Sequence, residues 1–237
     1  RVSIYFNEGK ALRWRQQVVG RSGSHNVRIA DIGNDGDIDI IGANHGNYGG
    51  DTPVDIWENL TNRPAPTLAL DRWQRHVIDP KRPWGAAFIR SGDLDGDGLR
   101  DIVSGGFWYR NPGRVAQPPS AGDSAWPRQA IGDPLNDAAV ICDFDLDGAL
   151  DILGTQGKTP AGSANFAWAR NDGRGNFTIH TNLAPASGDF LQGCTTIFTA
   201  YRRREVALSW HRANQGIQMF TVPKDPVAQT WPWRKIS

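Results

Sequence analysis

The sequence predicts an all-β protein folded as a β-propeller, with four full blades of four strands and one half blade. Three observations carry this prediction. An acidic loop pattern recurs along the chain, short apolar runs flank each copy, and aromatic residues recur in the strands that follow. The predicted blades lie at about 1–20 (the half blade), 26–79, 85–132, 137–182 and 192–237.

The acidic loop is clearest at residues 93–101, where Asp occupies loop positions 1, 3, 5 and 9 and Gly occupies position 6. Alternate carboxylates on a tight turn converge on one point, where they would repel one another without a cation. Calcium takes six to eight oxygen ligands in a flexible geometry, which such a loop can supply. The predicted Ca²⁺ ligands are the side chains of Asp93, Asp95, Asp97 and Asp101 and the carbonyl of Leu99.

Two further copies of the loop predict two further sites. Residues 143–151 match the pattern at every position, whereas residues 31–39 lack a side chain at position 3, which is Gly33. In that copy Asn34 or water would fill the gap. The predicted ligands are Asp143, Asp145, Asp147, Asp151 and the carbonyl of Ala149 in one loop, and Asp31, Asp35, Asp37 and Asp39 in the other.

An EF-hand is the closest competing loop, and the sequence excludes it. An EF-hand needs Glu at position 12 and flanking helices. Position 12 is Gly42, Ser104 or Gly154 in the three copies, and the flanking runs are short and β-branched.

Each loop is expected to join two short strands, followed by a third and a fourth. The strands before the loops are expected at 27–30, 86–89 and 138–141, and those after them at 38–41, 101–103 and 151–153. A third strand ends in Asn at 4–7, 56–59, 108–111 and 168–171. The fourth begins with an aromatic residue, at Trp14, Trp73, Trp126, Phe177 and Trp231.

The last unit lacks the acidic loop. Residues 196–201 lead directly into 202–208, and Glu205 stands where a ninth-position Asp would be. A guanidinium can satisfy a carboxylate without a metal, so we expect Arg202, Arg203 or Arg204 to pair with Glu205.

These loops and repeats resemble the FG-GAP/VCBS repeat family, the calcium-bearing propellers typified by integrin α-subunit heads and some fungal lectins. The resemblance covers nearly the whole chain, in full at 93–101 and 143–151 and in part at 31–39. Because such propellers are usually seven-bladed, the resemblance implies a segment of a larger propeller or an open, assembled form. The half blade would then be completed by further blades of a longer chain or by self-assembly with a neighbouring molecule.

Composition bears on the compartment and on the partner. The formal net charge is +1, and three bound Ca²⁺ would raise it by six. A positive surface suits an anionic glycan as partner. The alternative is that the arginines only solvate strand faces. Sequons at Asn59 and Asn176, together with the calcium loops, favour a secreted protein whose leader was removed, or a segment of a longer one. No run is long enough for a membrane span, and a bridge between Cys142 and Cys194 is left open.

The expected function is binding or adhesion rather than catalysis. The histidines show no metal-ligand spacing, and no nucleophile or phosphate-loop motif is present. The polar loop at 44–53 offers His45, Asn47 and Tyr48 as sugar contacts, unless it is a solvated connection. A glycan or an extracellular protein is therefore the expected partner, without nucleic acid. The alternatives are the propeller domain of a polysaccharide lyase or sugar dehydratase, and a structural subunit that forms fibres.

Overall fold

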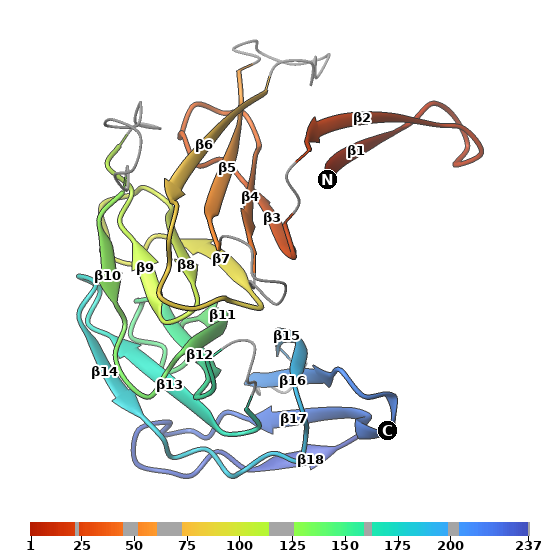
Figure 1. The fold of residues 1–237 in the computed structure, drawn as a ribbon. Coiled ribbons are helices and arrows are strands. Elements are labelled where there is room, and N and C mark those ends of the chain that lie inside the picture. The colour runs from red at the N-terminus through yellow and green to blue at the C-terminus, as the bar shows by residue number, and fades with distance from the viewer. Residues whose placement is uncertain are drawn as a thin grey trace.

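The computed structural model is all-β (Figure 1) and describes residues 1–21, 24–44, 52–60, 73–113, 126–158, 163–198 and 204–236. Its strands form five antiparallel sheets, one of two strands and four of four strands. Within these ranges the only helical element is a short 3₁₀ turn, Ala213–Gln215. No helix among them is long and apolar enough to cross a membrane.

Each sheet is a meander in which strands that follow one another in the chain pair with one another. The two-stranded sheet consists of β1 (Val2–Asn7) and β2 (Trp14–Gly20). The first full sheet consists of β3 (Asn26–Ala30), β4 (Asp39–Ala43), β5 (Val54–Asn59) and β6 (Trp73–Asp79). The second consists of β7 (Ile89–Gly92), β8 (Asp101–Ser104), β9 (Phe107–Tyr109) and β10 (Arg128–Ala130).

The third full sheet consists of β11 (Asp137–Cys142), β12 (Asp151–Thr155), β13 (Phe166–Asn171) and β14 (Phe177–His180). The fourth consists of β15 (Leu191–Phe198), β16 (Arg204–Trp210), β17 (Ile217–Thr221) and β18 (Trp233–Lys235). The sequence prediction therefore placed strands at or near most of these positions, although it gave no range for β17.

The four full sheets follow one another around an arc that is open on one side (Figure 1). Their first strands face the inside of the arc, where β7 lies against both β3 and β11, and β11 lies against β15. The last strands β6, β10, β14 and β18 lie on the outside. Because the acidic loops follow the first strands, this arrangement brings them to the inner part of neighbouring sheets.

Apolar side chains between adjacent sheets form the core. Separate clusters join the first sheet to the second, the second to the third, and the third to the fourth. Rings dominate the last of these junctions, where the ring centroids of Phe144 and Trp231 lie 5.2 Å apart. Trp57, Trp126, Trp168 and Trp231 are among the largest fully buried side chains, so these tryptophans serve packing.

Several strand boundaries differ from the sequence prediction. The largest shift is at β15, which begins at Leu191, five residues before the expected start at 196, because it pairs with β16 as far as Trp210. The strand expected at 86–89 begins only at Ile89, because its partner β8 ends at Ser104 opposite Ile89 and turns away through two glycines. The outer strands expected from Trp126 and Trp231 begin two residues later, at Arg128 and Trp233. Both tryptophans are buried and precede Pro127 and Pro232, which have no N–H to donate to a neighbouring strand.

In the fourth sheet Glu205 pairs with an arginine that the sequence analysis did not name. Arg234 on β18 donates from Nη1 to Glu205 Oε1 at 2.8 Å, and Glu205 is 5% exposed. Arg202 and Arg203 lie outside the described residues. The pairing with Arg202 or Arg203 therefore stays a prediction. Arg234 comes within reach of Glu205 on β16 because β18 pairs with β17, and β17 pairs with β16.

Candidate metal centre

The three acidic loops connect the first and second strands of the first three full sheets. Glycine at loop position 6 has a positive φ in all three, 89° at Gly36, 86° at Gly98 and 96° at Gly148. A residue with a Cβ adopts this conformation only with strain, so the glycine permits the bend. The three loops therefore share the same backbone conformation at this position as well as the same sequence pattern.

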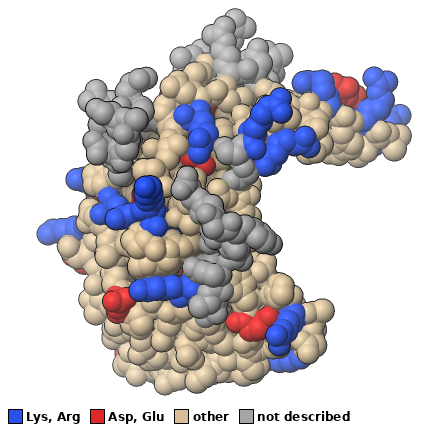
Figure 2. Space-filling model, viewed as in Figure 1, with Lys and Arg blue, Asp and Glu red and all other residues tan. Residues whose placement is uncertain are grey.

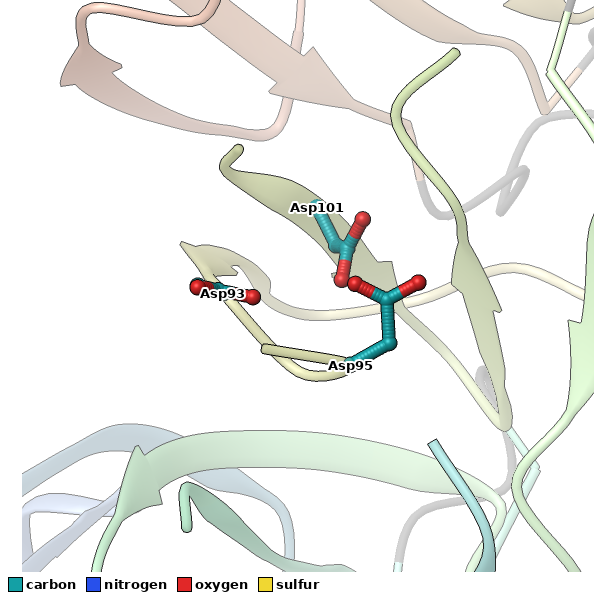
Figure 3. Close-up of side chains that lie close together, drawn as sticks. All are labelled: Asp93, Asp95 and Asp101. Atoms are coloured by element: carbon teal, nitrogen blue, oxygen red, sulfur yellow. The ribbon is translucent and has the colours of Figure 1, made fainter. Parts of the chain in front are cut away.

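Two of the loops bring three carboxylates together. Oxygen atoms of Asp93, Asp95 and Asp101 all lie within 4.8 Å of one another, and Asp143, Asp145 and Asp151 form the same group. Figure 3 shows the first group, with Asp93 and Asp95 on the loop and Asp101 at the start of the following strand. Each group offers three hard oxygen ligands to one cation.

The ninth-position Asp is buried and holds the loop closed. Asp101 accepts the backbone N–H of Leu94 at 3.0 Å and that of Asn111 at 2.8 Å. Asp151 accepts those of Phe144 and Asn171, both at 2.9 Å. Each carboxylate thus joins the start of its loop to the end of the third strand.

Burial makes the charged form of these residues costly. Burial, with a contribution from neighbouring carboxylates, raises the pKa of Asp101 and of Asp151 to about 7, against the lowering effect of their backbone hydrogen bonds. The same burial raises the pKa of Asp39 to about 6. A bound divalent cation would favour the ionised form, so these residues fit a metal better than an empty loop.

Two arginines lie over the remaining loop carboxylates. Arg110 Nε is 2.5 Å from Asp95 Oδ2, and its Nη2 is 3.4 Å from Asp97 Oδ2. Arg170 Nε is likewise 2.5 Å from Asp145 Oδ2, and its Nη2 is 2.9 Å from Asp147 Oδ2. These guanidinium groups partly neutralise the loop charge. The sequence analysis missed them, although a basic residue directly before the strand-end Asn is a signal it could have used.

A hydrogen bond joins the side chain at the fifth loop position to the backbone at the seventh. The N–H groups of Leu99 and Ala149 donate to Asp97 and Asp147, each at 2.9 Å. Asp97 and Asp147 therefore lie in the loops, as predicted, but belong to neither group of three carboxylates.

The first loop differs from the other two. Its aspartates form no group of three carboxylates among the described residues, because Gly33 supplies no side chain at position 3. Glu58 stands where the other sheets have Arg110 and Arg170, and it bonds His76 Nε2 at 2.8 Å instead. Asp37 Oδ2 is buried and has no hydrogen-bond partner in the described part of the chain, so a cation would satisfy an oxygen that otherwise has none.

Two of the recurring asparagines, Asn111 just after β9 and Asn171 at the end of β13, connect neighbouring sheets. Asn171 Nδ2 donates to the carbonyl of Leu94 in the preceding loop at 2.8 Å and to that of Leu150 in its own loop at 3.0 Å. Asn111 Nδ2 does the same with Ile32 at 2.9 Å and Arg100 at 3.0 Å. The sequence analysis recognised that this Asn recurs, but it did not predict these hydrogen bonds to the loop carbonyls.

The remaining predicted residues divide into three groups. Asn59 is fully buried, so the folded chain does not present it for modification, whereas Asn176 is exposed. Cys142 and Cys194 are free thiols and form no bridge. His45, Asn47 and Tyr48, the expected sugar contacts, lie outside the described residues.

No family model matches this chain, and no curated protein matches it. The assignment of a function therefore depends on the chemistry of the loops and on the arrangement of the sheets.

Proposed function

We propose that the chain is a calcium-binding β-propeller of the FG-GAP/VCBS type that acts outside the cell as a binding module for a glycan or a protein. The observation that carries the proposal is the pair of carboxylate groups at equivalent places in successive sheets, within 4.8 Å in each. The arc of sheets with their first strands inside supports a propeller, in which blades surround a common axis.

The ligand chemistry favours calcium among the common metals. Both groups consist of carboxylate oxygens, without the Cys or His that zinc prefers. Magnesium requires near-ideal octahedral geometry, whereas calcium accepts the irregular set that carboxylates, carbonyls and water on a flexible loop provide. Asp93, Asp95 and Asp101 would hold one ion, and Asp143, Asp145 and Asp151 a second.

The charge distribution supports binding to an anionic partner. Basic side chains are spread over the face shown in Figure 2, while acidic side chains are sparse there. Many of the acids lie in the three loops, where bound ions would cancel their charge. The outer surface would then present mostly positive charge to a partner.

Calorimetric titration of the chelator-treated chain with CaCl₂ tests the proposal. We expect two strong sites and a rise in melting temperature, because calcium would bind the folded loops and not the unfolded chain. Asp95→Asn should remove one strong site and Asp145→Asn the other. Asp225→Asn, at an exposed aspartate outside the loops, should leave both intact. A chain whose melting temperature does not respond to millimolar calcium or to chelation would refute the calcium part of the proposal.

Retention on immobilised glycans tests the binding part. A binding module should retain acidic oligosaccharides without altering them, whereas a lyase or dehydratase would release shortened or unsaturated products. Absence of retention on every glycan, with calcium binding intact, would redirect the search to a protein partner.

A further inference from the structure

A pocket of about 510 Å³ lies between the first and second full sheets, next to the first acidic loop. Arg28 and Ile29 on β3, Arg90 on β7, Arg100 at the end of the second loop, and Asp31 and Ile38 of the first loop are among its lining residues. It combines three cationic side chains with one carboxylate. Its volume is in the range of pockets that hold a small ligand rather than an extended chain.

The three arginines have no carboxylate partner among the described residues. Arg90 is only 8% exposed, and its hydrogen bonds go to the carbonyl of Ile89 at 2.8 Å and to that of Cys194 on β15 at 3.3 Å. Arg28 donates to Asn26 Oδ1 at 3.0 Å and to the carbonyl of Val27 at 2.7 Å. Arg90 therefore forms no ion pair among the described residues, and the charge of Asp137, which acts on it without a direct contact, compensates it only in part.

The positive charges in the pocket also repel one another. Burial and the neighbouring charge of Arg28 lower the pKa of Arg90 to about 10, which leaves it protonated at neutral pH. The single acid, Asp31, is engaged by the N–H groups of Asp35 and Gly36, at 3.1 and 3.0 Å. An anion in the pocket would therefore relieve the repulsion between Arg28 and Arg90, which Asp137 offsets only in part.

We propose that this pocket binds the carboxylate or sulfate group of an acidic saccharide. Guanidinium groups grip such anions through paired N–H donors, and Arg90 is already oriented by its carbonyl contacts. Ile29, which is 71% exposed, and Ile38 give the pocket an apolar wall against which the C–H face of a sugar ring packs. The inference deepens the binding function proposed above and depends on it, because it names the ligand class and the residues.

Isothermal titration of the calcium-loaded chain with five probes tests this site. The probes are a heparin-derived hexasaccharide, a galacturonate trisaccharide, maltotriose, sodium sulfate and a hexaglutamate peptide. We expect the two acidic saccharides to bind, with an affinity that falls as salt is added, and maltotriose not to bind. Sulfate or hexaglutamate binding as tightly as either acidic saccharide would overturn the saccharide assignment.

The variants Arg28→Gln and Arg100→Gln locate the site. Both arginines are exposed, and Arg90, which ties β7 to β15, is left in place. Each variant should weaken saccharide binding at least about tenfold, because a charge-assisted hydrogen bond is lost. Arg174→Gln removes an equal charge from an exposed turn elsewhere and should change affinity less than about twofold. An unchanged melting temperature in calcium would show that each variant is folded.

The outcomes separate this inference from the function proposed above. If the wild-type chain binds acidic saccharides but both pocket variants bind equally well, the pocket assignment fails and the binding function stands. If the wild-type chain binds no saccharide, the glycan function and the pocket fail together, while the calcium titration still decides the metal sites.

Discussion

Replacing Asn171 with Ala should destabilise the chain far more than a surface substitution. Asn171 is 1% exposed, and its Nδ2 donates to the carbonyls of Leu94 and Leu150 at 2.8 and 3.0 Å. Its Oδ1 also accepts the N–H groups of Gly173 and Gly175, both at 3.2 Å. Alanine would remove all four contacts and leave the Leu94 carbonyl buried without this donor.

The size of the effect follows from the number of buried bonds. A net loss of about 1 kcal/mol for each of the two bonds from Nδ2, together with the cost of unsatisfied buried carbonyls, gives about 3 kcal/mol. In a chain of this size about 1 kcal/mol corresponds to roughly 2–4 °C, so the melting temperature should fall by roughly 6–12 °C.

Urea unfolding followed by tryptophan fluorescence, at constant calcium, measures this loss. The matched control is Asn176→Ala, at an exposed asparagine whose Nδ2 donates to Asp172 Oδ2 at 2.8 Å. It should cost less than about 1 kcal/mol, because water replaces an exposed partner. The reasoning fails if Asn171→Ala costs no more than the control.

Four further predictions concern the acidic loops. Asp151→Ala should lower the melting temperature in calcium more than Asp35→Ala. The reason is that Asp151 is buried and accepts two backbone N–H groups, whereas Asp35 is exposed. Thermal unfolding of both variants measures the difference. Arg170→Gln should tighten calcium binding at the third loop several-fold, because it removes a cation that competes for the loop carboxylates. It should also destabilise the calcium-free chain, because two carboxylates lose their partner. A loss of calcium affinity would contradict this. The raised pKa values of Asp101 and Asp151, about 7 in the folded chain against about 3.9 when unfolded, should make the calcium-free chain lose stability as pH rises from about 4 to about 7. Calcium binding at about pH 6 should release protons, which calorimetry in buffers of different ionisation enthalpy detects.

The sequence predicted those features that depend on local patterns. The positions of Asp and Gly in the loops were sufficient because neighbouring residues along the chain determine a turn. The alternation of short apolar runs similarly located most strands. Burial of the ninth-position Asp raises the pKa of its carboxyl group above the usual value. This burial could not be predicted because it depends on packing between sheets.

The features that the sequence analysis missed depend on contacts across the fold. Arg234 reaches Glu205 only because β18 pairs with β17, and Arg90 reaches Cys194 from another sheet. The late starts of β10 and β18 were in principle readable, because a proline follows each buried tryptophan. The sequence analysis placed each tryptophan inside a strand because aromatic residues favour strands, and it did not consider that the following proline lacks a backbone N–H.

The amide of Asn171 also links the two acidic loops for which calcium binding is proposed. One side chain holds a carbonyl in the loop at 93–101 and another in the loop at 143–151. An ion that orders one loop would lower the entropic cost of ordering the next, and linkage requires the effect to be equal in both directions. If both loops bind calcium as proposed, their titration should be cooperative, with a Hill coefficient above one. In Asn171→Ala the two sites should fill independently.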